Sequence, residues 1–175
     1  MQLILQYFWQ MCRLKAGPEQ LPGSYFALAA TFSIYFILAL ITVAINQSQL
    51  EPLQVPVSVL SGVLIQAIVV LGILSFKGVR QRFVPVMTAL FGTNAIILII
   101  TMPLNGLLEM VQAGPIRQFV EILFLATFFW WLAIAGFILH RSAKVSLVQG
   151  MVIVFAVEIM VMLITFNLFP VEAQA

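Results

Sequence analysis

The chain has 175 residues, of which 63% are hydrophobic and 8% are charged, and its formal net charge is +2. A soluble domain of this length carries far more charge, so the composition excludes that class and predicts a polytopic membrane protein. The single cysteine, Cys12, excludes an internal disulfide framework and a multi-cysteine metal site. The small excess of basic residues reports orientation in a membrane protein, so no nucleic-acid partner is expected.

Residues 1–15 form the first predicted element, an amphipathic helix lying in the cytoplasmic interface of the membrane. Its polar residues recur at helical spacing as one narrow stripe, which consists of Gln2, Gln6, Gln10 and Arg13. Apolar residues such as Phe8 and Trp9 cover the remaining surface, which favours burial in the interface with the polar edge toward water. A secretory signal fits poorly, because the basic residues follow the apolar stretch and the stretch is too short to span.

Five segments are long enough to cross about 30 Å of hydrocarbon at about 1.5 Å per helical residue. They are residues 25–46, 57–76, 83–104, 118–139 and 147–169. The connections between them are short, so neighbouring helices must be antiparallel. The predicted fold is therefore all-α: the N-terminal interfacial helix, a single five-helix transmembrane domain over residues 25–169, and a short external tail over residues 170–175.

The basic residues indicate which way these spans run. If the spans alternate, all but one of the lysines and arginines fall on the same side: Arg13, Lys15, Lys77, Arg80, Arg82, Arg141 and Lys144. Arg117 falls on the other side, together with the carboxylates of Glu51, Glu109 and Glu172. Lysine and arginine are concentrated on the cytoplasmic side of membrane proteins, so we expect a cytoplasmic N-terminus and an external C-terminus.

Hydrogen-bonding side chains occur at similar depth in all the predicted spans. They are Tyr35, Gln66, Asn94, Thr127 and Glu158, and Trp131 follows one helical turn after Thr127. Polar side chains are costly in hydrocarbon, where they turn into the bundle and bond to one another. This pattern predicts one shared polar layer in the middle of the membrane.

Glu158 is the most informative member of this layer, because a carboxylate at the bilayer centre costs about 2–3 kcal/mol. The sequence places no basic residue at its depth. Glu158 is therefore protonated, faces a water-filled cavity, or pairs with a cation brought by a partner. One hypothesis makes it a proton or cation site. The other makes it a neutral acid bonded to Gln66 or Asn94, which fixes the helix arrangement.

The fourth span contains two adjacent tryptophans, which point about 100° apart on a helix. Trp131 lies on the same side as Thr127, so we expect its indole N–H to face the polar layer and bond to Asn94, Gln66 or Glu158. Trp130 is then expected to face outward. His140 marks the cytoplasmic end of this span, where a cationic or snorkelling role is favoured over catalysis.

Pairs of small residues four apart predict close helix packing on the second and third spans. The pairs are Ser58 with Gly62 and Thr88 with Gly92. The sequence contains no glycine-rich phosphate loop, HExxH, CxxC or GxSxG motif. We therefore predict no catalytic residue, no metal site and no cofactor, and we expect the protein not to be an enzyme.

The last two spans also carry a local pattern: Trp131 inside a helix, Gly136 shortly after it, and a short basic loop with Ser142 and Lys144. In this pattern and in its five-span topology the chain resembles the Yip1 family, in its short bacterial form. The resemblance implies a multi-pass protein of the bacterial inner membrane. It brings no catalytic residues with it, and the acidic-aromatic motifs of eukaryotic members are not seen here.

Two functional hypotheses follow. The first is a non-enzymatic scaffold, adaptor or subunit of a membrane complex, because five small spans cannot bury all of their own faces. Besides the lipid bilayer, it would have a membrane-protein partner or form a homo-oligomer. The second is a small proton- or cation-coupled transporter or permease component that uses Glu158.

Overall fold

The computed structural model describes residues 2–46 and 53–168, and these residues form helices and their connections without a strand. The elements in chain order are α1 (Gln2–Cys12), η1 (Pro18–Gln20), α2 (Tyr25–Asn46), α3 (Gln54–Phe76), η2 (Arg80–Arg82), α4 (Phe83–Met110), α5 (Pro115–Ala143) and α6 (Leu147–Leu168). The predicted residues Glu51 and Glu172, the end of the last span at position 169 and the tail at 170–175 lie outside the described residues.

Five of the described helices, α2 to α6, are long and apolar enough to cross a membrane. Helix α2 has the bounds expected for the first span, and α3 begins at Gln54 instead of position 57. Helix α4 continues past position 104 to Met110 and includes Pro103, whose ring lies on an exposed side of the helix. Helix α5 also begins earlier and ends later than expected, so the second half of the chain is more helical than the hydropathy pattern indicated.

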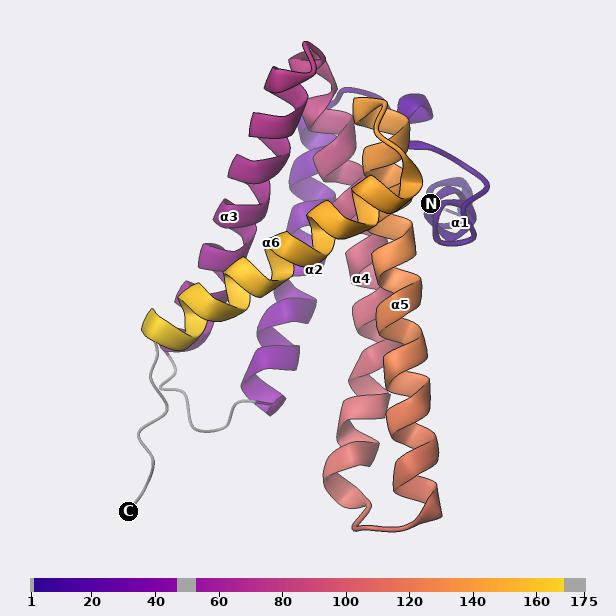
Figure 1. Cartoon of the computed structure of the whole chain (residues 1–175), viewed down its shortest axis with the longest axis vertical. Helices are drawn as coiled ribbons and strands as arrows, with labels where there is room; N and C mark the ends of the chain where they lie inside the picture. Colours follow the sequence, from indigo (N-terminus) through magenta and orange to yellow (C-terminus); the bar gives the residue numbers. More distant parts are fainter. Residues whose placement is uncertain (1, 47–52, 169–175) are drawn as a thin grey trace.

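The long helices are arranged so that the basic connections lie at one end of the bundle. Figure 1 shows the α3–α4 and α5–α6 connections at one end and the α4–α5 turn at the opposite end. Lys77 and Arg80 lie in the α3–α4 connection, and Lys144 ends α5. Helix α6 starts beside the end of α5 and runs diagonally toward the beginning of α3 (Figure 1).

Arg82 and Arg141 connect separate segments at this basic end of the bundle. The Arg82 Nη1 donates to the carbonyl of Ser142 at 3.1 Å and of Arg141 at 3.4 Å, so it caps the C-terminal end of α5. The Arg141 guanidinium pairs with the Glu19 carboxylate of η1 at 2.7 Å. A cation at a helix C-terminus also opposes the negative end of the helix dipole.

Helix α1 packs against α4 and α5, and its axis crosses theirs, since Figure 1 views α1 nearly end-on beside the long helices. It ends earlier than position 15. The N–H groups of Leu14 and Lys15 donate back to Met11 and Gln10, and Leu14 has a left-handed backbone with φ 59°. This is the hydrogen-bond pattern of a Schellman motif, which stops a helix.

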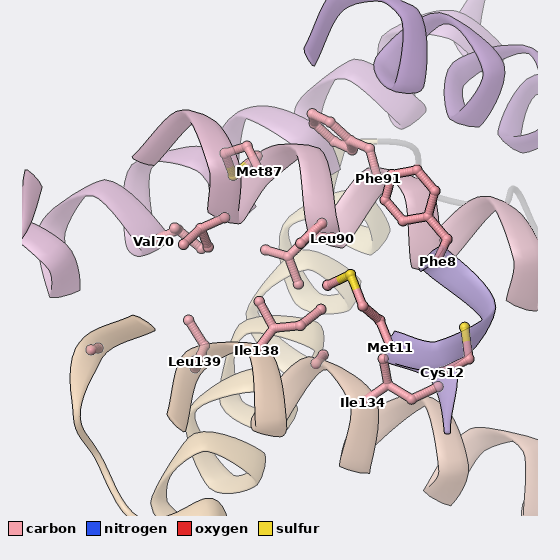
Figure 2. Close-up of a cluster of buried hydrophobic side chains, with 14 of the residues drawn as sticks. Phe8, Met11, Cys12, Val70, Met87, Leu90, Phe91, Ile134, Ile138 and Leu139 are labelled. Atoms are coloured by element: carbon pink, nitrogen blue, oxygen red, sulfur yellow. The ribbon is translucent and has the colours of Figure 1, made fainter. Parts of the chain in front are cut away.

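One face of α1 is buried in the protein core, so part of its apolar surface meets protein, while its location in the cytoplasmic interface stays a prediction. Phe8, Met11 and Cys12 are buried among side chains of α4 and α5 (Figure 2). Leu5 and Trp9 remain largely exposed. The membrane interface and the protein interior are both apolar, so the composition of this helix did not distinguish between them.

Helices α5 and α6 approach most closely where two glycines meet. A Cβ added to Gly150 would lie 2.4 Å from the carbonyl oxygen of Gly136, and one added to Gly136 would lie 2.7 Å from the backbone nitrogen of Met151. No side chain fits in that space, so this glycine pair allows the backbones to touch. The contact fixes the point from which α6 diverges.

Candidate functional site

A cavity of about 290 Å³ lies between the five long helices. All members of the predicted polar layer line it: Tyr35, Gln66, Asn94, Thr127, Trp131 and Glu158. Each of α2 to α6 therefore contributes at least one polar or aromatic side chain to a common space. The rest of the wall is mainly aliphatic.

Helical periodicity explains how these side chains reach the cavity. On α5, the lining residues Phe124, Thr127, Phe128 and Trp131 follow the spacing i, i+3, i+4, i+7. On α6, the same spacing gives Val154, Val157, Glu158 and Val161. Residues at this spacing share one face of a helix, so each helix turns a single stripe toward the cavity.

The Trp131 indole is hydrogen-bonded within the cavity wall. Its Nε1 donates to the Asn94 Oδ1 at 2.8 Å, which joins α5 to α4. Asn94 is buried and Trp131 is half-buried. This confirms the prediction that Trp131 faces the polar residues and bonds to one of the three proposed acceptors.

The remaining layer residues do not form a continuous hydrogen-bonded network. The Thr127 Oγ1 donates to the Leu123 carbonyl of its own helix at 2.8 Å. The Tyr35 ring stacks on Phe91, with ring centroids 5.4 Å apart. Among the described residues, no hydrogen bond links Tyr35 or Gln66 to another cavity side chain, although Tyr35 lies close enough to Glu158 to interact with it electrostatically.

Glu158 lines this space without a compensating cation among the described residues, and in the chain alone the residue is exposed. In the described parts of the chain, neither a basic side chain nor a hydrogen-bond donor contacts its carboxylate. The predicted bond from Glu158 to Gln66 or Asn94 does not form, and the Asn94 oxygen is already used by Trp131. The described salt bridges lie near the two ends of α5, with Arg117–Glu121 at its start and Arg141–Glu19 at its end.

Trp130 does not line the cavity, and of the outward surroundings open to it (lipid, a neighbouring helix or a partner) it meets a neighbouring helix, α1. Its Nε1 donates to the Cys12 carbonyl at the end of α1 at 2.8 Å. Its ring also meets Trp9 edge-on, with centroids 6.2 Å apart. The two adjacent tryptophans therefore join α5 to two different helices, because Trp131 is hydrogen-bonded to α4 and Trp130 to α1.

The four predicted packing residues have different surroundings. Gly92 leaves room for the Phe8 ring, because a Cβ there would lie 2.2 Å from a Phe8 ring carbon. At Gly62 a Cβ would make an ordinary 3.4 Å contact with Val161. The hydroxyls of the buried Ser58 and Thr88 donate to carbonyls of their own helices. None of the four brings two helix backbones as close together as Gly136 and Gly150 do at their contact.

His140 lies at the end of α5 and bonds through Nδ1 to the carbonyl of Val145 in the α5–α6 connection. Its ring also lies near Phe137. Within the described residues no group of three or more histidine, cysteine, aspartate or glutamate side chains is placed to hold a metal ion. His140 therefore has a structural contact at the basic end of the bundle.

The fold and cavity define a class: an α-helical protein whose described residues include five helices suited to crossing a membrane, with a cavity between them. Comparisons with protein-family models, with curated proteins and with solved structures found no match to this chain.

Proposed function

We propose that the protein spans a membrane five times and binds a proton or another cation at Glu158, as a small proton- or cation-coupled transporter or permease component. One observation carries this proposal: Glu158 lines a cavity between all five long helices without a cationic partner among the described residues. The proposal involves no covalent catalysis.

Membrane insertion is supported by the length and apolarity of α2 to α6. Most residues of α2 and α6 remain exposed or half-buried in the chain alone, and we assign these apolar surfaces to lipid. The gathering of Lys77, Arg80 and Arg82 with Arg141 and Lys144 at one end supports a cytoplasmic location for that end. The proposed setting is the bacterial inner membrane, with the N-terminus cytoplasmic and the C-terminus outside.

The binding of a proton or cation at Glu158 is supported by the free-energy cost of leaving its carboxylate ionised and unpaired. An unpaired carboxylate away from bulk water is unfavourable by several kcal/mol, which a bound proton or cation relieves. Intramembrane carboxylates commonly mark ion pathways and proton relays for this reason. Gln66 and Tyr35 line the same cavity and bring uncharged polar groups to it.

Proton flux in liposomes tests this function. The full chain is reconstituted around a pH-sensitive dye, and an imposed pH gradient is allowed to relax. We expect Glu158→Gln to reduce protein-dependent flux to the level of empty liposomes, whereas Glu109→Gln, at an exposed position near the end of α4, leaves it unchanged. If Glu158→Gln conducts protons as the original protein does, the proposal is wrong.

The scaffold, adaptor or subunit function stays a prediction, as does the resemblance to the Yip1 family. A membrane-protein partner or a homo-oligomer would then cover part of the exposed faces of α2 and α6. Purification in native lipid discs distinguishes the two functions. A reproducible stoichiometric complex together with unaffected flux in Glu158→Gln would favour the scaffold.

A further inference from the structure

We infer that the cavity accepts a small organic ammonium ion, with its charged head at Glu158 and its apolar body against the aromatic wall of α5. This ligand class rests on the proposed function, which requires only that Glu158 bind a proton or a cation. It is drawn from the charge of the cavity, the scarcity of oxygen ligands in it and the nature of its walls.

The charge of the cavity suits a monovalent cation. Among the described residues, Glu158 is the acidic residue that lines it, and no lysine, arginine or histidine of this part of the chain does so. A single carboxylate neutralises one positive charge. An anionic ligand would meet repulsion from Glu158 and find no basic side chain on the lining.

The oxygen supply in the cavity is too small for a hard metal cation. Ca²⁺ requires about six to eight oxygen ligands, and Mg²⁺ requires near-ideal octahedral geometry. The lining offers the Glu158 carboxylate, the Gln66 amide and a few hydroxyls, and the Asn94 oxygen already accepts from Trp131. The described residues also contain no acidic or histidine cluster for a metal. An ammonium ion needs far fewer ligands.

The wall formed by α5 suits the rest of such a ligand. Phe124, Phe128 and Trp131 line the cavity from one face of that helix, and the Phe128 and Trp131 rings lie 5.8 Å apart. Aromatic faces attract organic cations, and aliphatic walls bury their carbon substituents. A volume of about 290 Å³ is at the small end of ligand pockets, which favours a compact ammonium ion.

Calorimetric binding with matched probes tests the inference. The full chain in lipid nanodiscs is titrated with benzyltrimethylammonium and with neopentylbenzene, which has the same shape but no charge. We expect the ammonium to bind at least about tenfold more tightly than the neutral probe, which corresponds to one charged contact of about 1.4 kcal/mol. Glu158→Gln should abolish this preference, and Glu158→Asp, which keeps the charge, should retain it.

Two further variants separate the carboxylate from the aromatic wall. Phe128→Leu removes an aromatic face while leaving the Trp131–Asn94 bond in place, and we expect about fivefold weaker ammonium binding. Glu109→Gln is the matched control and should bind as the original protein does. Equal affinity for the two probes would overturn the ligand class, and so would unchanged ammonium binding in Glu158→Gln.

The liposome assay distinguishes failure of this inference from failure of the proposed function. If proton flux depends on Glu158 but benzyltrimethylammonium binds no better than neopentylbenzene, the ligand class is wrong and the proton site stands. If flux is independent of Glu158 and the ammonium and neutral probes bind with equal affinity, both the proposed function and the ligand class are wrong.

Discussion

The hydrogen bond from Trp131 to Asn94 makes a quantitative prediction about the wall of the cavity. Trp131→Phe removes the donor and keeps an aromatic ring, whereas Asn94→Leu removes the acceptor and keeps a similar volume. The bond is 2.8 Å long, and the acceptor side chain is buried. Leaving a buried acceptor unpaired costs about 1–3 kcal/mol, so Trp131→Phe should destabilise the protein by that amount.

A double-mutant cycle isolates the bond itself. Side-chain hydrogen bonds between membrane helices contribute about 0.6 kcal/mol on average and up to about 1.7 kcal/mol. We expect a coupling energy of about 1 kcal/mol between Trp131→Phe and Asn94→Leu, measured by reversible unfolding of the full chain in mixed micelles.

The neighbouring tryptophan provides the control. Trp130 donates to the Cys12 carbonyl and not to Asn94, so Trp130→Phe combined with Asn94→Leu should be additive within about 0.5 kcal/mol. A coupling as large for Trp130 as for Trp131 would show that the two indoles are not divided between α1 and α4 as described.

Three further predictions concern packing and the N-terminal helix. Gly150→Ala should lower the unfolding free energy by about 1–3 kcal/mol, because its Cβ would lie 2.4 Å from the Gly136 carbonyl oxygen. Gly72→Ala is the control: a Cβ there would have nothing within 4 Å, so the same unfolding assay should show that this substitution is tolerated. Burial raises the pKa of the Cys12 thiol from 9.0 to about 11, so the thiolate is disfavoured in the folded protein, and stability should be constant below about pH 9 and decline between about pH 9 and 11. Denaturant unfolding at several pH values checks this, and equal stability at pH 8 and 11 would refute it. Phe8→Ala should speed alkylation of Cys12 by a maleimide at pH 8, because it removes a buried anchor of α1, and an unchanged rate would contradict that anchoring role.

The sequence was sufficient to predict which polar residues meet, but not how they pair. Gln66, Asn94 and Glu158 could be placed together because each lies near the middle of a long apolar segment, where polar side chains turn inward. Their partners depend on distances of a few tenths of an ångström between different helices. Asn94 therefore bonds to Trp131, while Glu158 has neither of its predicted partners.

The position of α1 could not be derived from its pattern. Its bond from Trp130 to Cys12 joins residues 118 positions apart, and no local spacing signals such a contact. Its buried face, including Met11, would be equally apolar if it met lipid.

The glycine contact between α5 and α6 was missed for a related reason. Small-residue pairs were sought four positions apart within one helix, but the contact uses one glycine from each of two helices. Gly136 lies inside α5 and Gly150 in the first turn of α6, so a search confined to one helix could not pair them.

The central claim, a cation-binding carboxylate on the lining of the helical cavity, is tested most directly by chemical labelling of Glu158. A hydrophobic carbodiimide is added to the full chain in lipid nanodiscs, and the modified residue is identified by peptide mass spectrometry. We expect labelling at Glu158 and protection by benzyltrimethylammonium, which would occupy the carboxylate. The carbodiimide reacts with the protonated form of the acid. Labelling of Glu158 should therefore fall as the pH rises. Labelling that is absent from Glu158, or that neither the ammonium ion nor pH alters, would contradict the account.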